Sequence, residues 1–319
     1  MEQIAFISGN SVFYWNSVVL ALASGAASCI FLAFYLPGGR PGAAAAAVPG
    51  ALVLSLFFGR LLHWYFRPDS YPGFWSAITD YTSGGYALMG CFVGCAAAAG
   101  LVRLLRLEPF APAMLDAMSL GGCAGIAVGR LACFFSAADR GQLMPFTALP
   151  LAYPVNNVVT GAPEYRLATF VLQAMAAALI FAALAVFFLL GKKRRTGDVT
   201  LLFLLLYGLT QAVLDSTRYD SLYLRSNGFV SAVQLLSAAA LVGVSALFSA
   251  RMVKGRGMRR RYVPLWIGML ALLGGAGYME YFVQRHGDRA LFSYAIMTAC
   301  LGIFTALSLL TYRAAVKST

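Results

Sequence analysis

The sequence predicts an all-α protein that crosses a membrane several times. Of the 319 residues, 60% are hydrophobic and only 11% are charged, whereas soluble domains carry about 25% charged residues. The apolar residues are gathered into long runs, and an α-helix needs about 20 such residues to span a bilayer. We therefore expect nine spans, at residues 12–36, 43–66, 84–102, 112–136, 167–190, 199–217, 227–249, 263–283 and 290–312.

The basic residues give these spans a direction, because short cytoplasmic loops are enriched in Lys and Arg. With the N-terminus outside and the C-terminus inside, 15 of the 24 basic residues fall on the cytoplasmic side. This topology explains the net charge of +12 better than nucleic-acid binding does, since the basic residues form short clusters between spans. The fifteen are Arg40, Arg103, Arg106, Lys192, Lys193, Arg194, Arg195, Arg251, Lys254, Arg256, Arg259, Arg260, Arg261, Arg313 and Lys317.

Two outside segments are long enough to fold over the membrane surface. Residues 67–83 are rich in Tyr, Trp and Pro, as expected of an interfacial segment. Residues 139–166 contain four prolines and no long periodic run, which predicts a loop with room for short strands. The cytoplasmic loops are short and basic, so we expect any chemistry to face outward or to lie in the outer half of the bilayer.

The sequence predicts no metal site and no cofactor. All six cysteines lie within apolar runs, and none shows CxxC spacing, so neither a zinc site nor a disulfide framework is expected. The chain also has no Walker-type loop, no dinucleotide fingerprint and no HExxH motif.

Arg130 lies deep in the fourth predicted span, within the stretch 115–141. A guanidinium in an apolar run costs roughly 2.5–3.5 kcal/mol on insertion scales, so it is a functional hypothesis by default. We expect it to face the bundle interior and to pair with a carboxylate or a bound anion. Asp116 opens the same span, but about 14 residues at 1.5 Å each place it roughly 20 Å away. Asp116 is expected to be a helix-start carboxylate near the first turn.

Arg60 and His63 lie near the outer end of the second span. Arg60 is either a functional cation or a side chain that snorkels to the lipid headgroups. His63 stands beside Trp64 and Tyr65 with no second metal-ligating residue nearby. That context favours interfacial packing over catalysis.

Four polar residues follow a helical spacing of 4, 4 and 3 at the end of the sixth span: Tyr207, Gln211, Asp215 and Arg218. Asp215 and Arg218 are three residues apart, which predicts an intrahelical ion pair. Arg218 is also placed to snorkel. The stripe has two interpretations. It lines a cavity that holds an anionic lipid phosphate together with Arg130, because arginine forks match phosphate oxygens, or it makes structural bonds between helices.

The stretch from Asp116 to Gly141 resembles the signature of the prolipoprotein diacylglyceryl transferase family. In that family an aspartate opens the helix, and Gly-Arg-x-Gly-Asn-Phe-x-Asn-x-Glu-x-x-Gly follows about a dozen residues later. This chain has GRLACFFSAADRG at residues 129–141. Its Cys133 resembles the family's more distant branch, in which Gly-Cys-Phe replaces Gly-Asn-Phe.

Further blocks fall in the family's order, and the resemblance covers about residues 12–250. It implies a seven-span bundle of the family's kind at 1–250 and a two-span extension at 251–319. The blocks are YWNSVVLALA at 14–23, GRLLHWYF at 59–66, SGGYALMGCFVG at 83–94, TALPLAYPV at 147–155, YGLTQAVLDSTRYD at 207–220 and FVSAVQLLS at 229–237.

The resemblance implies a membrane enzyme of lipoprotein biosynthesis in the bacterial cytoplasmic membrane. The family moves diacylglyceryl from phosphatidylglycerol to the lipobox cysteine thiol of a preprolipoprotein and releases glycerol phosphate. The leaving phosphate needs cations, and the thiol needs a base. The candidate catalytic residues are Arg130, Asp139, Asp215 and Arg218. The candidate lipid-phosphate ligands are Arg130, Arg218, Gln211, Tyr207 and Gly129, with His63, Asp116 and Gln234 as further site candidates.

Several positions depart from the family pattern. The family's histidine falls at Met89, its first-span tyrosine at Asn16, its signature glutamate at Ala138 and the first arginine of its late motif at Gln211. The late motif's glutamate is Asp215. These departures keep an alternative open: a non-lipidating relative with the same fold that binds anionic lipid or acts on another headgroup substrate. A transporter or channel has less support, because no pair of matching halves is apparent.

Overall fold

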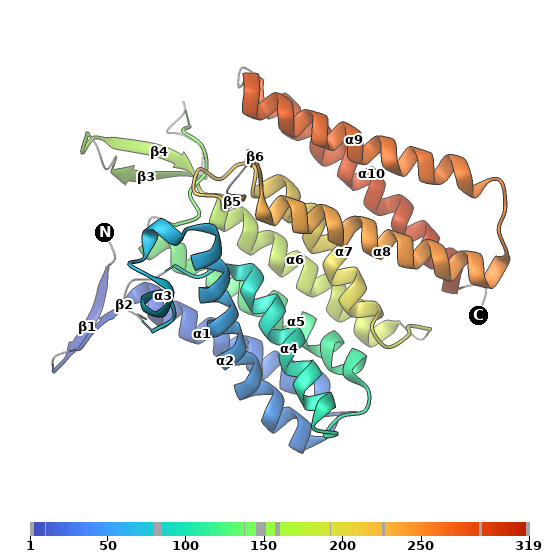
Figure 1. Cartoon of the computed structure of the whole chain (residues 1–319), viewed down its shortest axis with the longest axis horizontal. Helices are drawn as coiled ribbons and strands as arrows, with labels where there is room; N and C mark the ends of the chain where they lie inside the picture. Colours follow the sequence, from blue (N-terminus) through green and yellow to red (C-terminus); the bar gives the residue numbers. More distant parts are fainter. Residues whose placement is uncertain are drawn as a thin grey trace. The chain divides into compact units, whose positions relative to one another are not determined.

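The computed structural model describes residues 3–9, 11–79, 85–136, 138–144, 151–156, 160–191, 193–224, 227–286 and 289–316. These residues form a mostly helical chain with three small hairpins (Figure 1). The helices are α1 Trp15–Tyr35, α2 Pro41–Phe66, α3 Phe74–Thr79, α4 Leu88–Leu104, α5 Ala111–Arg130, α6 Thr169–Leu190, α7 Asp198–Leu214, α8 Ala232–Arg256, α9 Tyr262–His286 and α10 Ala290–Val316. The strands are β1 Ile4–Ser8, β2 Ser11–Tyr14, β3 Ala152–Asn156, β4 Pro163–Leu167, β5 Tyr223–Leu224 and β6 Asn227–Ser231.

The protein is an all-α polytopic membrane protein. In the described part of the chain, seven helices are long and apolar enough to cross a membrane: α1, α2, α5 with the 3₁₀ turn that follows it, α6, α8, α9 and α10. The remaining two expected spans, 84–102 and 199–217, form the shorter apolar helices α4 and α7. Each has 17 residues, which at 1.5 Å per residue extend about 25 Å.

Local sequence signals set several of the helix ends. Pro41 opens α2, where its missing N–H costs no hydrogen bond. Ser231 and Gln234 form a capping box that starts α8. Gly257 ends α8 with a φ of 72°, a conformation that glycine adopts without steric cost. The helix expected at 227–249 starts later than predicted, at Ala232, because residues 227–231 form β6.

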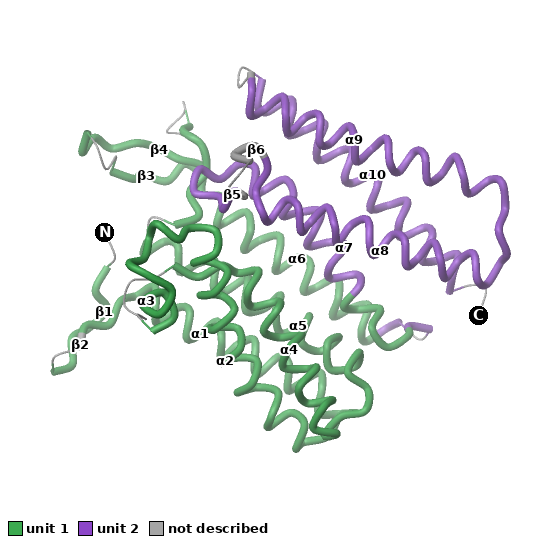
Figure 2. The backbone as a smooth tube through the Cα atoms, in the orientation of Figure 1, with its two compact units in different colours: residues 1–189, 195–200 green, residues 190–194, 201–319 purple. Residues whose placement is uncertain are grey.

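The backbone groups into two compact units (Figure 2). Unit 1 consists of residues 1–189 and 195–200, and unit 2 of residues 190–194 and 201–319. In unit 1, α1 packs along α5 and α2 packs along α4. In unit 2, α10 packs against both α8 and α9. The expected division into 1–250 and 251–319 stays a prediction.

Glycines allow a close contact between two helices of unit 1. A Cβ on Gly90 of α4 would overlap the backbone of Gly59 on α2, and a Cβ on Gly94 would overlap the backbone of Ser55. Small residues let two helix backbones approach in this way, which increases their van der Waals contact. The contact fixes α2 and α4 side by side (Figure 1).

The two long segments at 67–83 and 139–166 contain short regular elements. Within 67–83 lie a 3₁₀ turn, Pro68–Ser70, and α3. Within 139–166, β3 and β4 pair as an antiparallel hairpin. Residues 80–84, 145–150 and 157–159 lie outside the described residues, and with them parts of the expected span 84–102 and of the resemblance blocks at 83–94 and 147–155.

Candidate functional site

Arg130 is the last residue of α5 and forms an ion pair with Asp139. The two side chains are 12% and 11% exposed. Cys133, in the 3₁₀ turn that continues α5, donates its thiol hydrogen to Asp139 Oδ2 across 3.4 Å. Asp139 has a φ of 55°, a left-handed conformation that aspartate tolerates better than most residues. The carboxylate partner expected for Arg130 is therefore present, and it comes from the loop after α5.

Arg140 fixes the loop that carries Asp139. Its guanidinium donates to the carbonyl oxygens of Cys133 and Ser136, at 2.7 Å and 2.6 Å. It also lies over the rings of Tyr153 and Phe170, at 4.0 Å and 4.7 Å from their centroids. Sequence reasoning missed this buried cation. The signal that could have identified it is its position: Arg140 directly follows Asp139, the acidic residue of the signature stretch.

Two glycines of the signature stretch are packing residues. A Cβ on Gly129 would meet Ala23 of α1 at 3.4 Å. A Cβ on Gly141 would lie 2.7 Å from Leu167 Cβ, where the Gly141 N–H donates to the Leu167 carbonyl. The close approach at Gly141 joins the loop after α5 to β4. A phosphate-binding role for Gly129 stays a prediction.

Asp116 caps another helix, so its expected role at the start of its own helix is wrong. The side chain is 1% exposed and lies in the second turn of α5. It accepts hydrogen bonds from the N–H of Gly197 at 2.7 Å and from the N–H and hydroxyl of Thr200, both at 2.9 Å. These donors belong to the start of α7, whose first N–H groups have no partner within the helix. Asp116 is a structural carboxylate.

Arg60 does not snorkel, and that interpretation is wrong. The residue is 1% exposed. It donates to the carbonyl oxygens of Ala77 at 2.6 Å and Gly85 at 3.0 Å, and its guanidinium lies 4.8 Å and 5.2 Å from the ring centroids of Tyr71 and Tyr86. Arg60 thus joins α3 and the backbone at Gly85 to α2, because buried carbonyls need donors.

His63 pairs with a tyrosine beside Arg60. Its Nδ1 lies 2.7 Å from the Tyr71 hydroxyl, and the two rings meet edge to face. His63 is partly buried. This contact supports the packing interpretation, and a catalytic role stays a prediction.

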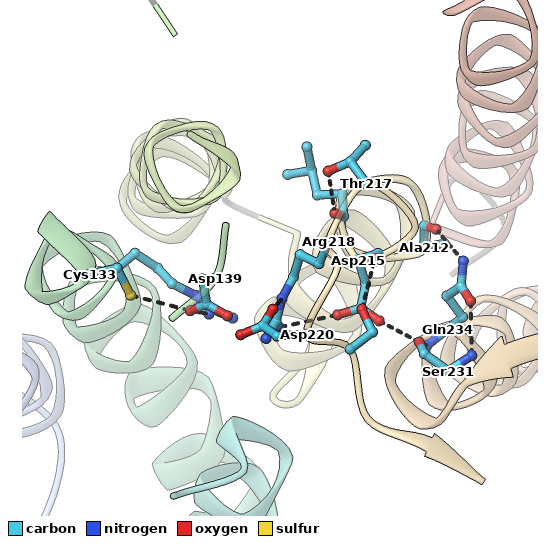
Figure 3. A network of polar contacts seen from close by, with 12 residues as sticks. Cys133, Asp139, Ala212, Asp215, Thr217, Arg218, Asp220, Ser231 and Gln234 are labelled. Atoms are coloured by element: carbon cyan, nitrogen blue, oxygen red, sulfur yellow. Dashed lines mark hydrogen bonds and ion pairs between the residues drawn. The ribbon is translucent and has the colours of Figure 1, made fainter. Parts of the chain in front are cut away.

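Unit 2 contains a second polar network, built around Arg218 (Figure 3). Arg218 forms ion pairs with Asp215 at 3.2 Å and with Asp220 at 3.0 Å. Asp215 also accepts a hydrogen bond from the Ser231 hydroxyl. The expected Asp215–Arg218 pair is present. It is not intrahelical, however, because α7 ends at Leu214 and the pair forms in the turn that follows.

The other polar candidates of unit 2 lie on the two helices that flank this turn in the chain. Gln234 is in the first turn of α8, and Gln211 and Tyr207 are on α7. Gln234 completes the capping box with Ser231, and its amide donates to the Ala212 carbonyl at 3.3 Å. Gln211 is buried on α7, and Tyr207 stacks on Phe203. Sequence reasoning missed Asp220 and Ser231, although the Ser-x-x-Gln spacing of the capping box was visible.

Burial and negative charge act on Tyr223 of β5. Burial raises the pKa of Tyr223, and the nearby carboxylates of Asp215 and Glu280 raise that pKa further.

In the part of the chain that the structure describes, no group of three or more His, Cys, Asp or Glu residues is arranged to hold a metal ion. The chemistry that the two networks offer is that of a guanidinium with carboxylate partners. In unit 1 this is Arg130 with Asp139, and in unit 2 it is Arg218 with Asp215 and Asp220.

Comparison with known proteins gives a consistent match. The model of the prolipoprotein diacylglyceryl transferase family matches residues 3–249. The phosphatidylglycerol–prolipoprotein diacylglyceryl transferases of Thermotoga petrophila and Thermotoga maritima are each 30% identical over 194 residues, which are 59% of this chain and 63% of theirs. The enzyme of that name from Finegoldia magna is 28% identical over 200 residues, 60% of this chain and 72% of its own. The chain thus spans less than two thirds of the length of the Thermotoga relatives, and α9 and α10 follow the matched part.

Proposed function

Because the chain belongs to the prolipoprotein diacylglyceryl transferase family, we propose that it transfers the diacylglyceryl group of phosphatidylglycerol to the cysteine thiol of a prolipoprotein. The donor and acceptor are those in the printed names of its relatives. The observation that carries the proposal is the Arg130–Asp139 pair, which stands in the segment that resembles the family signature. It combines an anion-binding group with a carboxylate.

The reaction needs charge stabilisation at the leaving group. The thiolate sulfur attacks the glyceryl carbon that bears the phosphate, the carbon–oxygen bond breaks, and glycerol phosphate leaves with the electron pair. A guanidinium has five N–H donors in a planar fork, so it can bind a phosphate and keep a carboxylate neighbour. Arg130 takes this role in unit 1. Arg218 is the corresponding candidate in unit 2, with Gln211 and Tyr207 on the helix that precedes it.

The thiol proton needs an acceptor, and the family's histidine position is Met89, which has no proton-accepting group. The candidates are Asp139, Asp215 and His63. Asp139 is supported by its contact with Arg130, because a base beside the phosphate ligand is placed at the reacting centre.

The proposed location is the bacterial cytoplasmic membrane, with the N-terminus outside and the C-terminus in the cytoplasm. The support is the distribution of basic residues. In this topology α5 runs outward, so Arg130 and the loop with Asp139 lie at the outer surface, where a prolipoprotein presents its lipobox after export.

The test is complementation of a bacterium depleted of its own transferase. Wild-type protein should restore lipidation of a reporter lipoprotein, detected as its mass increase. The Arg130→Ala variant should lose at least about 100-fold of the activity, the cost typical of losing one transition-state donor. Arg103→Ala, an exposed arginine at the end of α4, serves as the matched control. A well-expressed wild-type protein that lipidates nothing contradicts the proposal.

A second candidate function rests on Met89 and Gln211, which stand at family site positions and lack a base and a cation. It is a non-lipidating relative that binds an anionic lipid or acts on another headgroup substrate. Mass spectrometry of lipids that co-purify with the protein tests it. Enrichment of an anionic lipid that disappears in Arg130→Ala supports this candidate, and equal lipid content in the two proteins removes its basis.

A further inference from the structure

The turn that joins α8 to α9 carries more positive charge than any other turn on the predicted cytoplasmic side. Six basic residues fall within residues 251–261, whereas the other three turns on that side carry one, two and four. Four of the six side chains are exposed, and the other two are partly buried. The six are Arg251, Lys254, Arg256, Arg259, Arg260 and Arg261.

The end of α10 adds a seventh positive charge to this turn. Met252 near the end of α8, Tyr262 at the start of α9 and Ala315 near the end of α10 pack together as one cluster of buried residues. The three helix ends therefore meet in unit 2 (Figure 1). Arg313 lies two residues before Ala315 and is exposed. We call the seven residues the basic corner: Arg251, Lys254, Arg256, Arg259, Arg260, Arg261 and Arg313.

No acidic residue lies near the basic corner in the chain. Asp and Glu are absent from residues 221–279 and 289–319. Glu280 is 18 residues beyond the start of α9, about 27 Å along the helix. The two other turns with more than one basic residue each have a carboxylate at hand, Glu108 in the first and Asp198 in the second. A topology signal needs only an excess of Lys and Arg, so seven charges without a carboxylate indicate an anionic partner.

Tyr262 supplies a hydroxyl at the point where the three helix ends meet. Its side chain is 6% exposed, and the hydroxyl has no hydrogen-bond partner among the residues that the structure describes. The Arg261 guanidinium lies 5.6 Å from the centroid of its ring. A buried hydroxyl without a partner is costly. A phosphate oxygen is an acceptor for this hydroxyl and for a guanidinium alike.

An apolar stripe on α9 begins directly after the basic corner. Val263, Ile267 and Leu270 follow a spacing of four and three residues, so they share one face of the helix. They are 42%, 61% and 66% exposed. Positive charge at the end of a membrane span, followed by an exposed apolar face, matches a phospholipid with its anionic head and its acyl chains. A free phosphate ion would use only the charged part of this surface.

We propose that the basic corner binds the headgroup of an anionic phospholipid. The phosphate accepts hydrogen bonds from the arginines and from the Tyr262 hydroxyl, and the acyl chains lie along Val263, Ile267 and Leu270. Clusters of about four to eight basic residues beside a membrane span are typical of such binding. All seven residues of the corner lie beyond the family-matched residues 3–249, and the inference does not depend on the proposed transfer reaction.

The test measures which lipid lies next to Trp266, four residues after Tyr262 on α9. The full-length chain is placed in vesicles that contain phosphatidylglycerol and phosphatidylcholine in both leaflets, so its orientation does not matter. One lipid at a time carries bromine on its acyl chains, and bromine quenches the fluorescence of a neighbouring indole. The other three tryptophans are changed to make Trp266 the only fluorophore: Trp15→Phe, Trp64→Phe and Trp75→Phe.

Trp266 should select phosphatidylglycerol over phosphatidylcholine by about fivefold or more, because each Lys or Arg near an anionic surface contributes about fivefold in affinity. A triple variant, Arg259→Gln with Arg260→Gln and Arg261→Gln, should lose this preference. Salt at about 1 M should weaken the preference of the wild type, because it screens exposed charges. An unchanged Tm of the triple variant in detergent shows that its fold is kept.

The matched control removes three positive charges from other turns, by Arg40→Gln with Arg103→Gln and Arg106→Gln, and should leave the preference at Trp266 unchanged. Equal quenching by the two lipids in the wild type overturns the inference. So does a preference that the control and the first triple variant lower equally, since any loss of charge would then suffice. No transfer is measured, so either result leaves the proposed function standing.

Discussion

Asp116 of α5 binds Thr200 of α7 twice: a single carboxylate oxygen accepts the N–H and the hydroxyl of Thr200, each at 2.9 Å. The other oxygen accepts the N–H of Gly197. The two helices are 84 residues apart in the chain at this contact. A carboxylate on one helix thus satisfies the N-terminal donors of another.

The Asp116→Ala variant should therefore be less stable. It leaves three donors of the first turn of α7 without their acceptor, and buried hydrogen bonds to a charged group contribute about 1.5–3 kcal/mol. We expect a loss of about 3 kcal/mol, seen as a lower Tm in detergent. Ser119→Ala, which removes one longer contact to Thr200 at 3.3 Å, should lose less. Equal Tm values for Asp116→Ala and wild type would contradict the capping role.

Gly90→Ala tests the contact between α2 and α4. The added methyl group would overlap the Gly59 backbone, so the helices must separate, at a cost of about 1–3 kcal/mol. Gly100→Ala on the same helix is the matched control, because its Cβ would meet nothing within 4 Å. Thermal unfolding should show a lower Tm for Gly90→Ala only. A Gly90→Ala protein as stable as Gly100→Ala would show that the contact is looser than described.

Arg130→Lys separates charge from geometry at the candidate site. Lysine keeps the positive charge but lacks the planar fork that matches phosphate oxygens. If Arg130 binds the phosphate through the fork, transfer of diacylglyceryl to a lipobox peptide should fall by about 10-fold or more. Lys at this position still pairs with Asp139, so folding should be kept. Full activity of Arg130→Lys would mean that charge alone is needed.

Glu108 should make stability depend on pH. A hydrogen bond from the Tyr35 hydroxyl lowers the pKa of Glu108, and its contact with the Phe110 N–H adds to this. A lowered pKa in the folded state means that the stabilisation is complete above the unfolded pKa and is lost as the pH falls through the folded value.

Tyr35→Phe removes the largest cause of that lowered pKa. Between about pH 7 and about pH 3, the Tm of the wild type should therefore fall more than the Tm of Tyr35→Phe. Parallel losses in the two proteins would assign the acid sensitivity to other groups.

Much of the fold could be predicted because hydropathy acts segment by segment. Each apolar run partitions into the membrane by its own length and composition, so each segment predicted as a span contains a helix in the part that the structure describes. The Asp215–Arg218 pair was predictable for a similar reason, since residues three apart meet within one turn. The capping box at Ser231 and Gln234 was also a local pattern.

The partners of the buried polar groups depended on the tertiary structure. Asp116 meets Thr200, Arg60 meets Gly85, and Arg130 meets Asp139 through contacts that the spacing within one helix does not predict. Such partners follow from helix packing, which the spacing of residues in one helix does not encode. The sequence by itself determined the membrane class, the family and the presence of a paired Arg130. Packing alone decided that Asp116 caps α7 and that Asp139 pairs with Arg130, because a buried charge is satisfied by whichever group lies nearest in space.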